Sequence, residues 1–366
     1  MNAGKPVTGK SFIGRKNELE VILNLLKSGQ SVVIIAPRRF GKTSLVLEIL
    51  RQLNKPEYFT AFVDLFSTPN MEELSLAITS AVLENKKLDQ LFSKLKNSAL
   101  SMIQNAKIKA VIEDFEFLLS YSESQQNAWH MLENSIDFIN DFAGKHDKEM
   151  VCALDEFGDI KKFDGSKIIK LFRSKIQRQD HATYIFSGSY ESVMNELFIE
   201  KQAPFYRFAR IITLGPIDKE LFLKHYNSEL RKQGINYKES DCREILDFTK
   251  GHPYYSQLAL QQLIISYKVN NILPKPVQLF DELLLVERNY LEKVWDELQR
   301  SKENTKVVLA IVSAKTGIYA TVKDSKVNVS RSIQKLVGNG FLIKTSGSSP
   351  QLSDPLFEYW IKRNVL

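Results

Sequence analysis

The sequence predicts an α/β fold in which helices cover both faces of a parallel sheet, followed by a helical domain and a small tail domain. Up to Pro216, apolar runs of strand character alternate with helical patterns. Helical periodicity alone then continues to Leu298, and the last stretch combines short helices with short strands. Because 366 residues exceed what one hydrophobic core usually organises, we expect three domains, at 1–216, 217–300 and 301–366.

Five apolar runs in the first domain are expected to form the sheet. They are Ser31–Ala36, Tyr58–Phe66, Met150–Leu154, Tyr184–Phe186 and Arg210–Leu214. A helix over Asn17–Lys27 precedes the first strand, and another over Ser44–Leu53 follows it after a short loop. Strands that alternate with helices in this way favour parallel pairing.

The rest of the chain is expected to be helical, with a different ending. The predicted helices of the second domain are Asp218–Gln233, Asp241–Phe248, Pro253–Tyr267 and Leu279–Leu298. In the tail, helices at Asn304–Ser313 and Val327–Val337 precede β-like pieces at Phe341–Thr345 and Gln351–Ser353. Two helices followed by a two-stranded wing predict a winged helix.

The tail is also the basic part of the chain. Of the formal net charge of +7, most lies beyond Ser301, where ten Lys or Arg face four Asp or Glu. On its second helix one face is apolar, and we expect four polar side chains to point outward: Ser330, Arg331, Gln334 and Lys335. Such a face can meet duplex DNA, or it can pack against an acidic partner or the chain's own domains; both interpretations stay open.

Composition places the chain among ordinary globular proteins, with 43% apolar and 25% charged residues. No apolar run is long enough to cross a bilayer, and the first ten residues lack the apolar segment of a signal peptide. Only two cysteines occur, Cys152 and Cys242, and the first lies in an apolar strand run. We therefore expect a cytoplasmic protein without membrane contact.

The loop after the first strand predicts a phosphate-binding site. Ala36-Pro-Arg-Arg-Phe-Gly-Lys-Thr43 fits G-x-x-x-x-G-K-[ST] except for Ala36 at the first glycine. Gly41 permits the turn, Lys42 supplies the charge for the β and γ phosphates, and Thr43 offers a hydroxyl to magnesium. The residues expected at the nucleotide are Pro37, Arg38, Arg39, Phe40, Gly41, Lys42, Thr43 and Ser44. The alternative is a basic turn that happens to contain these letters.

A buried strand ending in Asp155 and Glu156 is expected to complete the site. We expect Asp155 to hold magnesium through water and Glu156 to orient and deprotonate the attacking water. An ordinary strand end with two solvated carboxylates is the alternative. Together with the loop, the acidic pair predicts that the chain binds ATP or ADP with magnesium.

Six segments in order resemble the archaeal-type ATPase family, a branch of the AAA+ and signal-transduction P-loop ATPases. Besides the loop and the acidic strand end they are Phe12–Glu18, Phe186–Ser189, Gly251–Tyr255 and Asp354–Trp360. The resemblance covers essentially the whole chain. It implies a sheet of order 5-1-4-3-2, a helical lid as the second domain, and Ser187 or Ser189 as a polar sensor near the γ-phosphate.

The resemblance also implies residues outside the loop and the strand end. Ile13 and Gly14 would line the adenine pocket, while Gly251, His252 and Pro253 would approach the nucleotide from the lid. The two glycine segments can instead be a helix start and a helix separator. The lid segment lacks the second-sensor arginine of many AAA+ proteins. Of the two candidates for an arginine finger, Arg207 and Arg210, we take Arg210 as the catalytic one, although a surface role fits both.

Three functions are compatible with these residues. The first is an ATP-driven switch, in which nucleotide closes the sheet domain against the lid and tail. The second is a DNA-associated ATPase that holds duplex through its winged helix, and the third is a nucleotide-binding scaffold with little hydrolysis. An intact Glu156 favours hydrolysis, and the missing finger predicts slow turnover until a partner or second subunit supplies an arginine.

Overall fold

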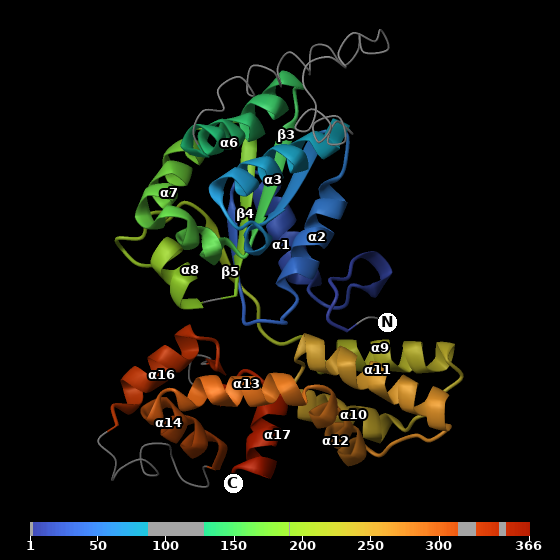
Figure 1. The fold of residues 1–366 in the computed structure, drawn as a ribbon. Coiled ribbons are helices and arrows are strands. Elements are labelled where there is room, and N and C mark those ends of the chain that lie inside the picture. Colours follow the sequence, from blue (N-terminus) through green and yellow to red (C-terminus); the bar gives the residue numbers. More distant parts are fainter. Residues whose placement is uncertain (1–2, 87–127, 190, 314–326, 344–348) are drawn as a thin grey trace, which may run out of the picture.

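The computed structural model describes residues 3–86, 128–189, 191–313, 327–343 and 349–366. Figure 1 shows two parts: an α/β part built on the sheet, and a helical part formed by α9 to α17. The first described residues reach both parts, since the Ala3 amide donates to Gln261 Oε1 of the helical part at 3.0 Å.

The sheet has five parallel strands in the order β2-β3-β4-β1-β5. Their bounds are β1 Val32–Ile35, β2 Tyr58–Asp64, β3 Glu149–Asp155, β4 Ala182–Gly188 and β5 Arg210–Thr213. This order confirms the 5-1-4-3-2 arrangement. The central strands β1, β3 and β4 are buried almost throughout, which explains their continuous apolar runs.

Alternate side chains of the strands contact helices on opposite faces of the sheet. Val32 and Ile34 pack with α1 (Lys16–Lys27) and α2 (Lys42–Leu53). Val33 and Ile35 belong to a second cluster with the helices of the other face. Those helices are α3 (Met71–Leu83), α6 (Ala128–Lys145), α7 (Lys161–Ile176) and α8 (Glu191–Phe198). Short 3-10 helices lie at Gly9–Ser11, Leu65–Ser67, Glu84–Lys86 and Phe157–Ile160.

The lid, which we define as residues 219–299, contains five helices. They are α9 (Lys219–Lys232), α10 (Glu239–Thr249), α11 (Pro253–Asn270), α12 (Pro276–Val286) and α13 (Arg288–Gln299). The single helix expected over Leu279–Leu298 is therefore wrong: the chain leaves helical geometry at Glu287, with φ −97° and ψ 8°. Glu287 is a buried carboxylate held by contacts from elsewhere in the chain, described below.

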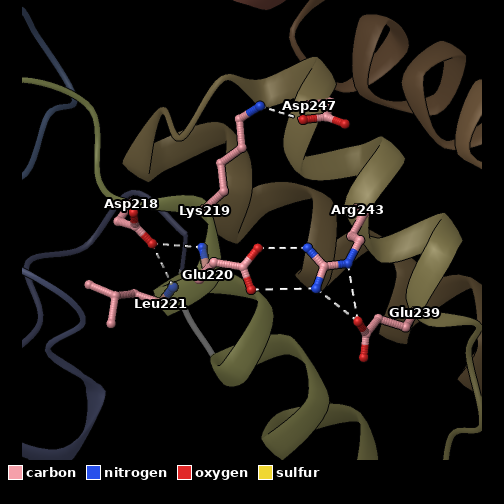
Figure 2. A network of polar contacts seen from close by, with 7 residues as sticks. All are labelled: Asp218, Lys219, Glu220, Leu221, Glu239, Arg243 and Asp247. Atoms are coloured by element: carbon pink, nitrogen blue, oxygen red, sulfur yellow. Dashed lines mark hydrogen bonds and ion pairs between the residues drawn. The ribbon is translucent and has the colours of Figure 1, made fainter.

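Exposed polar contacts join the first two lid helices (Figure 2). Asp218 caps α9, because its carboxylate accepts from the Glu220 amide at 2.8 Å. Arg243 on α10 lies between two carboxylates, 2.6 Å from Glu220 and 2.9 Å from Glu239. Exposed pairs of this kind contribute little to stability, so the packing of apolar side chains holds these helices together.

The tail contains α14 (Lys302–Ser313), α16 (Val329–Gly338), α17 (Pro355–Asn364) and two short antiparallel strands, β6 (Leu342–Ile343) and β7 (Gln351–Leu352). The predicted strand Phe341–Thr345 extends beyond the described residues, because positions 344 and 345 lie outside them. On α16 the four polar side chains expected to face outward are exposed, while Val329, Ile333 and Leu336 are buried. The name winged helix stays a prediction.

Lid and tail share one hydrophobic core. Phe280 and Leu283 of α12 lie in the same buried cluster as Leu336 of α16 and Phe357 of α17. The tail also contacts the α/β part, where α16 lies against α8 and Ile343 packs on the cluster of α1 and α2. Of the helices in the described ranges, none has the length and apolar composition to cross a membrane.

Candidate active site

The phosphate loop lies where β1 passes into α2. All four residues of β1 are buried, and α2 begins at Lys42, directly after Gly41. Gly41 has a φ of 83°, a left-handed conformation that favours glycine. The amides at the start of α2 are directed toward the carboxyl edge of the sheet, the arrangement that binds phosphate at a helix N-terminus.

The Lys42 side chain connects the phosphate loop with Ser189 at the end of β4. Its buried ammonium donates to the carbonyls of Ala36 at 3.1 Å and Pro37 at 3.2 Å, and to Ser189 Oγ at 2.6 Å. Burial lowers the pKa of Lys42, and the negative charges of Glu156 and Asp155 act in the opposite direction. The ammonium is therefore held between the loop carbonyls and Ser189, with the two carboxylates close enough to favour its charge.

Asp155 joins the ends of β3 and β4 to the start of α2. Its carboxylate accepts from Thr43 Oγ1 at 2.7 Å, from its neighbour's amide, Glu156 N, at 3.1 Å, and from Ser187 Oγ. Because β4 lies between β1 and β3, Ser187 stands between the loop and the acidic pair. Ser187 has no exposed surface, so its contact with Asp155 orients that carboxylate from below.

Glu156 is held by the other serine. Its backbone has a φ of 48°, unusual for a residue other than glycine, and its carboxylate accepts from Ser189 Oγ at 2.6 Å and Ser189 N at 3.2 Å. Ser189 Oγ also accepts a hydrogen bond from the Lys42 ammonium. The two serines that the resemblance left as alternatives thus have different neighbours: Ser187 contacts Asp155, and Ser189 links Lys42 to Glu156.

A cavity of about 700 Å³ opens above these residues. It lies between the sheet edge, the first residues of the chain and the start of α11, and its volume suits a nucleotide. The predicted site residues that line it are Ile13, Arg38, Arg39, Phe40, Gly41, Lys42, Thr43, Ser44, Asp155, Glu156, Ser189 and Pro253. The N-terminal segment is tied to α2 beside it, because Val7 N donates to Ser44 Oγ at 3.1 Å.

Other predicted site residues lie outside the cavity lining. Gly14, with a φ of 68°, packs against Ile217, where a Cβ would come within 2.8 Å of the isoleucine Cγ2. Pro37 contributes its carbonyl to Lys42. Gly251 approaches Ile217 so closely that a Cβ would lie 2.2 Å from the Ile217 carbonyl oxygen. These glycines therefore serve the junction between the sheet domain and the lid.

Arg210 does not join this site. It pairs in register with Val32 at the amino end of β1, whereas the phosphate loop follows the carboxyl end. Its side chain is exposed. Arg210 therefore lies away from the nucleotide-sized cavity of its own chain.

His252 contacts the phosphate loop through the side chain of Phe40. Its ring lies edge-on to Phe40, with centroids 4.6 Å apart, and Nδ1 accepts from Tyr255 N at 3.5 Å as the cap of α11. Burial lowers the pKa of His252 to about 3, and the charge of Arg39 adds to the effect. The imidazole is thus neutral where the lid meets the loop.

This buried histidine predicts a loss of stability in acid. The unfolded chain takes up the proton near pH 6.5, while the folded chain resists it down to about pH 3, so the stabilisation is complete above pH 6.5 and is lost as the pH falls through this window. We expect His252 to lower the free energy of unfolding by about 2 kcal/mol between pH 7 and pH 5. Urea unfolding of wild type and His252→Asn measures it, and an equal pH slope in both proteins would contradict it.

Among the cavity-lining residues that were not predicted are Asp64 and Arg15. Asp64 ends β2 directly beside Asp155 in register; burial raises its pKa, and the charges of Asp155 and Glu156 add to this. Arg15 is buried and donates to the carbonyls of Phe40, at 3.4 Å, and Gly215. An acid at the end of a strand was a usable signal for Asp64, whereas a lone arginine before a helix carries none.

The oxygen atoms at Thr43 and Asp155 fit magnesium. Magnesium is usually held by one or two protein oxygens together with water and substrate phosphates. Thr43 Oγ1 and Asp155 Oδ2, 2.7 Å apart, supply such a pair. In the described part of the chain, no group of three or more His, Cys, Asp or Glu is placed to form a metal site without a substrate.

A parallel sheet of this order with a phosphate loop on β1 and an acidic pair on β3 defines a P-loop ATPase. Residues 12–259 match the family described as an ATPase domain predominantly from Archaea, and the chain belongs to that family. It follows that the chain is an ATP-binding ATPase. No curated protein matches the chain.

Solved structures show the same fold at low identity. A Walker-type ATPase of Pyrococcus abyssi is 17% identical, with a TM-score of 0.70 over 98% of this chain and 99% of that one. The ORC2 protein of Aeropyrum pernix, in ADPNP and ADP complexes, is 13% identical, with a TM-score of 0.57 over 97% and 95%. The ORC1 protein of Aeropyrum pernix in complex with DNA is 11% identical, with a TM-score of 0.50 over 97% and 94%.

Proposed function

We propose that this ATPase is a nucleotide-driven conformational switch. The observation that carries the proposal is the position of the cavity, which has the phosphate loop on one side and Pro253 and Tyr254 of the lid on the other. A nucleotide held there touches both parts of the molecule. Its binding and hydrolysis can therefore change how the lid and the tail lie against the sheet domain.

Each residue of the hydrogen-bonded network has a role in this proposal. Lys42 and the amides at the start of α2 bind the β and γ phosphates, and Thr43 and Asp155 would hold magnesium. The metal would neutralise part of the phosphate charge. Glu156 accepts the proton of the attacking water, and Ser189, which bonds both Glu156 and Lys42, responds to the γ-phosphate.

Turnover is expected to be slow in the isolated chain. Within the described residues, the arginines that line the cavity are Arg15, Arg38 and Arg39. Arg15 holds backbone carbonyls, and Arg39 is bound to the lid. A finger supplied by a partner, or by Arg210 of a second subunit, would accelerate hydrolysis.

Hydrogen exchange in three states tests the switch. With ATP and magnesium, amides in α11 and α12 should exchange more slowly than with ADP or without nucleotide, because the closed lid is stabilised. The Lys42→Ala variant is the control and should show no nucleotide effect. Identical exchange of the lid amides with ATP and with ADP would contradict the switch and favour a scaffold.

The DNA interpretation can be tested in the same measurement. The exposed face of α16 carries Arg331 and Lys335, which suits duplex DNA, whereas the contact of α16 with α8 suits intramolecular packing. Slower exchange in α16 on adding duplex at low salt, lost at high salt, would support DNA binding. Exchange unaffected by duplex at low salt would leave packing as the role of this face.

A further inference from the structure

Arg39 leaves the phosphate loop and enters the lid. Its guanidinium lies over the rings of Tyr254 and Tyr290, 4.3 Å from each centroid, and one nitrogen is 2.8 Å from Glu287 Oε2. The Tyr254 hydroxyl donates to the other oxygen of the same carboxylate. We call Tyr254, Glu287 and Tyr290 the socket.

The socket holds its arginine firmly. The side chain of Glu287 is only 8% exposed, and a buried carboxylate without a cation is strongly destabilising. Burial acts to lower the pKa of Arg39, but the hydrogen bond and charge of Glu287 outweigh it, so the pKa is raised. A planar guanidinium can stack on two rings and bond a carboxylate in its own plane, which an ammonium cannot do.

The loop and the lid are consequently joined by side chains that adjoin the phosphate site. Arg39 has a φ of 65° and lies three residues before Lys42, within the turn that must wrap the phosphates. Phe40, the next residue, contacts His252 at the start of α11. A change in the loop on nucleotide binding therefore displaces groups that are packed into the lid.

The connection continues into the tail. Tyr255, the neighbour of Tyr254 on α11, donates its hydroxyl to Asp354 Oδ2 at 2.6 Å. Asp354 caps α17, since its other oxygen accepts from Phe357 N at 2.8 Å. The segments Gly251–Tyr255 and Asp354–Trp360, both part of the family resemblance, thus meet through the bond between Tyr255 and Asp354.

We infer that Arg39 and its socket are the contact that transmits the state of the phosphate loop to the lid and tail. Arg39 is then a positioning residue, which acts on the lid and leaves the phosphates to Lys42 and the loop amides. The cavity is already of nucleotide size with Arg39 in the socket, so the contact and bound ATP are compatible. This inference rests on the proposed switch.

A double-mutant cycle tests the inference. The variants are Arg39→Ala, Glu287→Gln and the two combined. The matched control is Arg288→Ala, because Arg288 directly follows Glu287 and forms an exposed ion pair with Glu292 instead of a contact with the loop. The measurements are the Kd for ATP with magnesium and the ATP-dependent slowing of exchange in α11, α12 and α17. Circular dichroism without nucleotide verifies that each variant is folded. If Glu287→Gln does not fold, the test rests on Arg39→Ala alone.

Each single variant should weaken ATP binding about tenfold and abolish the ATP-dependent slowing in the lid and in α17. The double variant should be no weaker than either single one, since both remove the same contact. The control should behave as wild type.

Three results would overturn the inference. If Arg39→Ala keeps the ATP-dependent slowing of hydrogen exchange seen in wild type, the lid responds to ATP by another route. Effects that add in the double variant show that Arg39 and Glu287 act separately. If ATP does not slow hydrogen exchange in the lid of the wild-type protein, the switch itself is wrong, and the inference falls with it. This outcome is distinct from the other two because it is seen before any substitution is made.

Discussion

Lys42→Ala should lower the affinity for ATP by about 3 kcal/mol, roughly 100-fold in Kd. The ammonium is held beside the loop by the carbonyls of Ala36 and Pro37 and by Ser189, and it exchanges such partners for oxygens of the β and γ phosphates when ATP binds. Loop amides alone cannot replace this charge, because they offer partial dipoles where a full cation stood. Titration calorimetry with ATP and magnesium measures the loss.

The outcome also depends on the loop remaining in place. Removing Lys42 frees the carbonyls of Ala36 and Pro37, so unfolding of the variant without nucleotide should be compared with wild type. If the variant is folded and still binds ATP as tightly as wild type, the assignment of this loop to phosphate binding is wrong.

Glu156→Gln should keep ATP binding and reduce turnover at least 100-fold, the typical contribution of a general base. The amide keeps the size of the side chain and can accept one hydrogen bond from Ser189, but it cannot accept the proton of water. Phosphate release under saturating ATP measures the loss. Asp159→Asn, at an acid that also lines the cavity, is the control and should retain most turnover.

Asp64 provides the decisive comparison for Glu156. It ends the strand next to Asp155, and burial together with the charges of Asp155 and Glu156 raises its pKa, so it is a second carboxylate near the phosphate site that could act as a base. If Asp64→Asn abolishes turnover while Glu156→Gln retains it, the base lies on β2, and the role assigned to Glu156 is wrong.

The sequence predicted those parts of the molecule that depend on local patterns. The central strands are long apolar runs because both faces are covered, and the loop and acidic pair stand out by residue type and spacing. The α17 helix also had its local signal, since Asp354 and Pro355 form a cap and first turn, but the segment was interpreted only as a motif.

Contacts between distant segments could not be predicted in the same way. Arg39 and Glu287 are 248 positions apart, and neither residue type indicates its partner. The same contact explains the error in the lid, where apolar periodicity continues through Glu287 while the chain turns there to present a carboxylate to the loop. Tertiary interactions override helical periodicity at this point.

The common core of lid and tail has a mechanical consequence. Because the two parts are packed as one unit, the lid cannot tilt without carrying the tail. This unit touches the α/β part at the phosphate loop through α11, and also at places apart from the loop, among them the contact of α16 with α8. We therefore expect it to act as a lever: a small displacement beside the nucleotide changes the fit between α16 and α8, where another molecule could detect it.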